Sequence, residues 1–102
     1  MNFFSVVGPW AGSCLNANDK LPNNERTQIR VDITSKEQCL RECKLKENVS
    51  GCHYQVMQGY DYNIENYYSQ KKCFFYTSPV KGYGQIIISS RYKGSLCWKI
   101  EA

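Results

Sequence analysis

Tyrosine is the residue type in this chain that is best suited to binding chemistry, and it is concentrated in one segment. Five of the eight tyrosines lie between residues 54 and 68, among amide and carboxylate side chains. A tyrosine offers a rigid apolar face and a hydrogen-bonding hydroxyl, which suits contacts with sugar rings and with protein hot spots. We therefore predict a ligand-binding surface made of Tyr60, Asp61, Tyr62, Asn63, Asn66, Tyr67 and Tyr68.

A purely structural role explains the same tyrosines equally well. Tyr60 and Tyr62, followed by Tyr67 or Tyr68, would suit alternation along the two strands of a hairpin. The tyrosines could also pack a loop. The binding and structural interpretations both remain open at the level of sequence.

Catalysis and metal binding find little support in the sequence. The only histidine, His53, follows Cys52 in a predicted core strand, which favours a structural role. Asp61, Asn63 and Glu65 alternate like the oxygen ligands of a calcium loop, but the central glycine and the later bidentate acid are missing. We predict no enzymatic activity, no catalytic residue, no cofactor and no metal site.

Six cysteines in a short chain indicate a disulfide framework and an oxidising, extracellular environment. Their spacing lacks the C-x2-C pairs typical of zinc sites. Cys39 and Cys43 are four residues apart on a predicted helix, so we expect them to tie that helix to other elements rather than to each other. Fifteen pairings are possible for six cysteines, and spacing alone does not select one.

Composition predicts one folded domain spanning residues 1–102. Hydrophobic residues make up 42% of the chain and charged residues 22%, values that argue against disorder. No apolar stretch approaches the roughly 20 residues that span a bilayer, so we predict no membrane insertion. The net charge of +4 comes from scattered lysines and arginines, and we predict no nucleic-acid partner.

Apolar periodicity predicts one helix and several short strands. The helix runs from Thr34 to Lys46, with Thr34 as N-cap and Glu37 completing a capping box. Strands are predicted at residues 26–33, 52–56, 73–76, 85–90 and 96–100, and residues 3–10 could form a first strand or a strap along the core. One helix packed on a small antiparallel sheet, with long loops, is an α+β fold.

From about residue 10 to residue 100 the sequence resembles the PAN/apple domain family. The resemblance is carried by the cysteines and their neighbours, which are Cys14, Glu37-Gln38-Cys39-Leu40-Arg41-Glu42-Cys43, Gly51-Cys52-His53-Tyr54, Cys73-Phe74-Phe75-Tyr76 and Cys97-Trp98. It implies a curved antiparallel sheet that cradles one helix. It also implies the disulfides Cys14–Cys97, Cys39–Cys73 and Cys43–Cys52.

The resemblance further implies a non-enzymatic module that binds proteins or carbohydrates. The family has no shared binding motif, so no functional residue is carried over. The long tyrosine-rich stretch between Cys52 and Cys73 departs from the family pattern.

Two further surface features are weaker. Asn48-Val49-Ser50 matches the N-glycosylation sequon, which makes Asn48 a candidate acceptor. Gly82-Tyr83-Gly84 and Arg91-Tyr92-Lys93 could form a basic aromatic patch, although an ordinary turn and a solvated strand end explain them better.

These observations predict a secreted recognition module, and we expect a lectin-like carbohydrate binder. The alternatives are a protein-interaction or adhesion module, and a secreted disulfide-rich effector or inhibitor. An inhibitor needs a rigid exposed loop, whereas the tyrosine-rich stretch has no proline or cysteine to stiffen it. Since a single module would bind sugar weakly, we expect a homo-oligomer or several copies to supply avidity.

Overall fold

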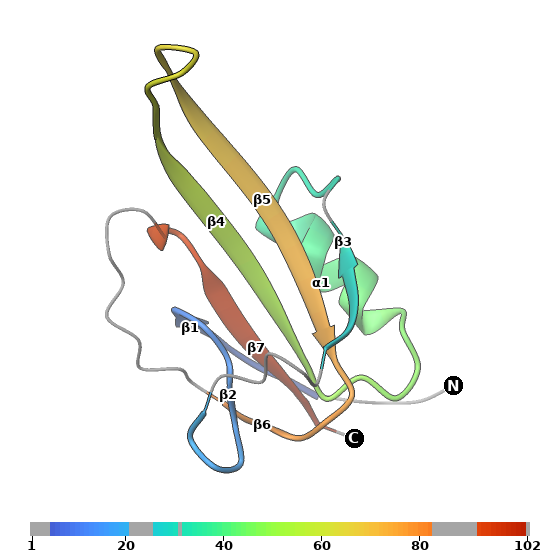
Figure 1. Cartoon of the computed structure of the whole chain (residues 1–102). Helices are drawn as coiled ribbons and strands as arrows, with labels where there is room; N and C mark the ends of the chain where they lie inside the picture. Colours follow the sequence, from blue (N-terminus) through green and yellow to red (C-terminus); the bar gives the residue numbers. More distant parts are fainter. Residues whose placement is uncertain (1–4, 21–25, 31, 83–91, 102) are drawn as a thin grey trace.

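The computed structural model describes residues 5–20, 26–30, 32–82 and 92–101. Its strands are β1 Ser5–Ala11, β2 Leu15–Asn16, β3 Arg26–Arg30, β4 Gly51–Asp61, β5 Asn66–Tyr76, β6 Val80–Gly82 and β7 Leu96–Glu101. Five of them form an antiparallel sheet in the order β1-β7-β4-β5-β3, and β2 pairs with β6. The helix of the described residues, α1 at Lys36–Lys44, lies on one side of the large sheet (Figure 1). The α+β, disulfide-rich class is confirmed.

Each predicted strand that the structure describes is present, but three differ in length. The strand predicted at 26–33 was too long, because β3 ends at Arg30 and Ile33 instead packs with the helix cysteines ahead of α1. Two others are longer than predicted. The predicted strands 52–56 and 73–76 are the inner ends of β4 and β5, which continue outward through the tyrosine-rich segment. That segment is therefore a hairpin and not a long loop. The predicted strand 85–90 lies outside the described residues, as do positions 3 and 4 of the first predicted strand.

The predicted helix cap was wrong by one residue. Ser35, not Thr34, is the N-cap, and its hydroxyl accepts a hydrogen bond from the backbone N–H of Gln38. Thr34 instead donates from its backbone N–H and its hydroxyl to Oε1 of Gln38. Ser35-Lys36-Glu37-Gln38 fits the capping-box pattern as well as the quartet one residue earlier, so the sequence alone did not fix the register.

The two faces of the large sheet carry separate cores because side chains alternate along each strand. On the helix side, Phe75 and Trp98 pack with the helix cysteines, Tyr54 and Ile33. On the other side, Phe74 and Tyr76 pack with Val80 and the Cys14–Cys97 pair. The inner ends of β4 and β5 are thus covered on both faces.

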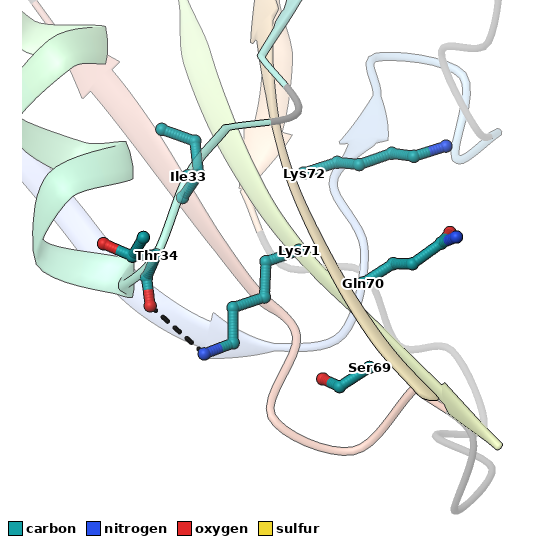
Figure 2. Close-up of a pocket in the computed structure, with 6 residues that line it drawn as sticks. All are labelled: Ile33, Thr34, Ser69, Gln70, Lys71 and Lys72. Carbon is teal, nitrogen blue, oxygen red and sulfur yellow. Dashed lines mark hydrogen bonds between the residues drawn. The ribbon is translucent and has the colours of Figure 1, made fainter. Parts of the chain in front are cut away.

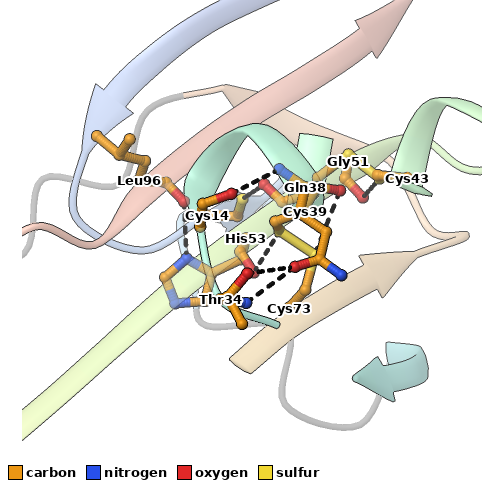
Figure 3. The surroundings of a disulfide bond; sticks show 11 residues. Cys14, Thr34, Gln38, Cys39, Cys43, Gly51, His53, Cys73 and Leu96 are labelled. Atoms are coloured by element: carbon orange, nitrogen blue, oxygen red, sulfur yellow. Dashed lines mark hydrogen bonds between the residues drawn. A yellow bond between two sulfur atoms is a disulfide. The ribbon is translucent and has the colours of Figure 1, made fainter. Parts of the chain in front are cut away.

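Three disulfides join the helix and the segment before β2 to this sheet. Cys39–Cys73 attaches α1 to β5, and Cys43–Cys52 attaches it to β4 (Figure 3). Cys14–Cys97 connects the segment before β2 to β7. This is the pairing that the family resemblance implies, and the two helix cysteines tie the helix down separately, as expected from their spacing.

The β4–β5 hairpin extends well beyond the rest of the fold. In the part of the chain that the structure describes, β7 pairs with β4 from Gly51 to Tyr54, β3 pairs with β5 from Cys73 to Tyr76, and neither pairing continues outward. The rest of the hairpin forms a projecting two-stranded ribbon (Figure 1), and the molecule measures 48 × 27 × 22 Å. At the other end of the sheet β1 pairs with β7, which brings Ser5 opposite Glu101.

Candidate functional site

The turn at the end of the projecting hairpin is organised by its own polar side chains. Asp61 and Asn66 face each other across the strands, and residues 62–65 form the turn between them. Oδ1 of Asp61 accepts a hydrogen bond from the backbone N–H of Asn63 at 2.9 Å, which is an Asx turn. Oδ1 of Asn66 accepts from the N–H of Tyr67 at 2.8 Å. Of the predicted binding residues, Asp61 therefore stabilises the turn, and Asn66 makes a local contact at the start of β5.

Three of the predicted tyrosines form one cluster at this end of the hairpin, which we call the tyrosine tip: Tyr60, Tyr62 and Tyr67. Tyr60 and Tyr67 are cross-strand partners, and their ring centroids are 5.0 Å apart with planes at 75°. Tyr62 packs on Tyr60 at 4.9 Å and 72°. Edge-to-face packing of this kind orients the rings against one another.

The tyrosine tip is also the most exposed aromatic surface among the described residues. Tyr62 is 84% exposed and Tyr67 is 78% exposed, while Tyr60 between them is 39% exposed. Ile64, in the turn, is 65% exposed and adds an aliphatic side chain. Ile64 was not among the binding residues predicted from the sequence. The Asp61-x-Asn63 turn signal could have placed it at the apex of the hairpin.

The remaining tyrosines of the segment lie elsewhere. Tyr68 follows Tyr67 along the strand and so points to the opposite face of the hairpin. Its ring lies over Gly59, where an added Cβ would be 2.9 Å from the Tyr68 hydroxyl. Tyr54 is in the helix-side core, where burial, and secondarily the charge of Glu37, raises the pKa of its hydroxyl. The five clustered tyrosines of the sequence therefore divide into a surface group and a structural group.

The candidate calcium ligands Asp61, Asn63 and Glu65 all lie in or beside the turn, where they contribute to its local geometry. Asp61 accepts the Asx-turn hydrogen bond, and Glu65 has a left-handed backbone with φ of 51°. Within the described residues, no group of three or more His, Cys, Asp or Glu side chains could hold a metal ion.

His53 is part of the core. It is 3% exposed, its ring stacks on Phe74 at 5.5 Å, and Nδ1 lies 3.1 Å from the carbonyl oxygen of Leu96 (Figure 3). Since a carbonyl oxygen only accepts, Nδ1 carries the proton in this contact. All six cysteines are bonded in disulfides, which leaves no thiolate nucleophile.

The structure describes the predicted glycosylation site in full and the predicted basic aromatic patch only in part. Asn48 is exposed, with φ of 60°, in the turn between α1 and β4, and the Ser50 hydroxyl of its sequon donates to the carbonyl of Thr77. Tyr83, Gly84 and Arg91 of the second aromatic patch lie outside the described residues. In the described part of the chain, no helix has both the length and the apolar character needed to cross a membrane.

Comparison of the chain with protein-family models, with curated proteins and with solved structures finds no match.

Proposed function

We propose that this chain is a secreted, non-enzymatic recognition module of the PAN/apple type that binds carbohydrate through the tyrosine tip. The observation that carries the proposal is the exposure of Tyr62 and Tyr67, 84% and 78%, at the end of a projecting hairpin. Two aromatic rings held in fixed orientation by a third offer flat apolar faces for the C–H faces of a sugar ring.

Exposure of this kind is costly unless it serves binding. Contiguous apolar surface on a soluble domain marks an interaction site more often than isolated exposed residues do. The tip needs little reorganisation on binding, because each tyrosine has few rotatable bonds and Tyr60 already contacts both neighbours. Amides and hydroxyls around the rings supply the polar contacts that a sugar requires.

The disulfide scaffold supports the extracellular part of the proposal. Three bridges in a domain of 102 residues are typical of proteins that work in oxidising compartments. A surface of three tyrosines would bind one sugar weakly, so the module would work as a homo-oligomer or in several copies.

A second candidate function is protein adhesion through the same tip. Ile64 is 65% exposed beside the tyrosines, and an aliphatic side chain suits a pocket on a partner protein better than it suits a sugar. Interface hot spots combine such anchors with tyrosine.

A glycan-array screen of the oxidised domain tests the first function. The Tyr60→Ala/Tyr62→Ala variant should lose selective binding, because it removes the central ring and one exposed face. The control is Tyr92→Ala, which removes a tyrosine that is 37% exposed and precedes β7, and it should bind like wild type.

A blank array from a folded protein would reject the carbohydrate proposal and favour adhesion. In either case, Ile64→Ala in a cell-surface binding assay checks the assignment independently, since it should weaken a protein contact while leaving a sugar contact unchanged.

A further inference from the structure

The outer edge of β5 is a second surface, away from the tyrosine tip. Within the described residues, β3 pairs with this edge from Arg30 to Arg26, opposite Cys73 to Tyr76. Among the described residues no strand continues alongside Ser69–Lys72. In an antiparallel sheet, alternate residues direct their N–H and C=O groups away from the neighbouring strand. Part of the Ser69–Lys72 backbone is thus directed outward from β4.

A pocket of about 590 Å³ adjoins this edge. It is lined by Ile33 and Thr34, which precede α1, and by Ser69, Gln70, Lys71 and Lys72 of β5 (Figure 2). Nζ of Lys71 donates to the carbonyl oxygen of Thr34 at 3.1 Å. This contact holds the segment before the helix beside the strand and forms one wall of the pocket.

The two lysines serve opposite faces of the strand. Figure 2 shows Lys71 directed toward Thr34, while Lys72 and Gln70 extend to the other side. A strand placed along this edge would present successive side chains to the same two faces. Two neighbouring residues of such a strand would therefore meet the two lysines, one on each face.

We propose that the β5 edge at Ser69–Lys72 binds an extended acidic segment of a partner protein by β-strand addition. Main-chain hydrogen bonds to the outward-directed groups would give the affinity, and two consecutive carboxylates would pair with Lys71 and Lys72. An apolar side chain flanking the acidic pair would enter the pocket beside Ile33.

Charge decides between this occupant and a second copy of the chain. The chain carries a net charge of +4, and lysines on an exposed edge disfavour pairing between identical copies. Pairing with an acidic strand is favoured instead, because a carboxylate then lies opposite each lysine. A sulfated sugar would match the charge but would leave the main-chain donors and acceptors unused.

The test is an NMR titration of the oxidised domain with the peptide acetyl-TVTEETVT-amide. Amide shifts should change at Ser69–Lys72 and at Thr34, with affinity near the millimolar range expected of a short unconstrained strand. The matched peptide with Gln in place of both Glu residues should bind about 5-fold more weakly. Two further peptides are N-methylated at alternate residues, so that each lacks the N–H donors along one of its two edges. The peptide that is methylated on the edge facing β5 should not bind, although its charge is unchanged.

A charge reversal on the protein provides the second measurement. Lys72→Glu should weaken binding about 5-fold or more, because an attraction becomes a repulsion. Lys93→Glu, an exposed position before β7, makes the same change in net charge and should leave binding unchanged.

Four outcomes would overturn the proposal. They are no shift with the acidic peptide, equal weakening by Lys93→Glu, binding that survives both N-methylations, and binding of a heparin hexasaccharide at these amides when the peptide does not bind. The peptide variants keep the test decisive even if Lys72→Glu fails to fold. A failure here would leave the tyrosine tip untouched, since Tyr60→Ala/Tyr62→Ala alters neither lysine.

Discussion

The inner and outer halves of the β4–β5 hairpin share one uninterrupted register but have opposite surroundings. In the inner half, Gly51–Tyr54 and Cys73–Tyr76 are buried throughout. In the outer half, which comprises residues 58–61 and 66–70, most side chains are exposed. The inner half has a neighbouring strand on each side, whereas the outer half has none among the described residues.

Membership of the hairpin does not by itself make a residue important for stability. What matters is whether adjacent strands, the helix and the disulfides pack against it. Inner-half side chains reach two cores and two helix disulfides, so changes there should affect folding. Outer-half side chains contact mostly one another, so changes there should affect binding with little effect on folding. An isolated two-stranded ribbon is marginal in water, so the stapled inner half must hold the outer half in register.

The largest expected effect is removal of the bridge behind the inner half. Cys14–Cys97 joins residues 83 apart in sequence, and in the chain-entropy account such a link contributes about 4–5 kcal/mol to stability. Cys14→Ala/Cys97→Ala should lower the unfolding free energy by that order in urea titrations followed by circular dichroism. Tyr60→Ala/Tyr62→Ala should lower it by about 1 kcal/mol or less, and a similarly small loss for the cysteine variant would show that the two halves do not differ in their contribution to stability.

The second largest difference is expected when one aromatic side chain in each half is replaced by alanine. Phe75 is 1% exposed, and Phe75→Ala should cost about 3–5 kcal/mol by leaving a cavity between helix and sheet. Tyr67→Ala removes a ring of similar size that is 78% exposed, and it should cost about 1 kcal/mol or less. Thermal melts of the two variants measure the contrast directly, and similar melting temperatures would contradict it.

The same small substitution can be made in both halves of β4. A Cβ at Gly51 would be 3.0 Å from the carbonyl oxygen of Trp98 and would also press on Val80, so Gly51→Ala should cost about 1–3 kcal/mol. The three atoms nearest to a Cβ at Gly59 all belong to the Tyr68 side chain and none to the backbone, so the contact can be relieved by a shift of that ring. Gly59→Ala should therefore cost less than about 1 kcal/mol in the same unfolding assay. A reversed order would show that the outer half is the better packed.

The smallest effect concerns pH and the buried inner-half tyrosine. Burial, and then Glu37, raises the pKa of Tyr54 in the folded protein above the unfolded value of 10.0. Since the unfolded chain releases this proton first, the related stability is fully present below pH 10 and is lost as pH rises through the folded-state pKa. Tyr54→Phe should lose less stability than wild type between pH 9 and pH 11, about one unit either side of the reference. Parallel urea curves for the two proteins would refute this.

The inner half could be read from the sequence far better than the outer half. The helix and the inner ends of β4 and β5 were predicted because apolar residues and cysteines mark their buried positions. For the outer parts of both strands the sequence offered a hairpin only as an alternative to a loop, because most side chains of residues 58–70 stay exposed and leave no pattern of buried positions. The N-cap shifted to Ser35 because neighbouring hydroxyl residues offered two equivalent capping boxes.

The candidate site was predicted as a list of residues but not as a surface. Whether a tyrosine joins the tip depends on strand register, which separates Tyr67 from Tyr68 and places Tyr54 in the core. Nothing in the sequence indicated the pocket beside Ser69–Lys72. It depends on where β3 ends and on Thr34 meeting Lys71, residues that are 37 positions apart.

The pairing of β1 with β7 has a consequence for protein engineering. Ser5 and Glu101 are directly opposed, so their Cα atoms are about 5 Å apart. This junction lies at the end of the sheet remote from the hairpin turn (Figure 1). Two short linkers could therefore splice the domain into a surface loop of a carrier protein without stretching either chain. The hairpin would then project from the carrier protein with its turn exposed to solvent.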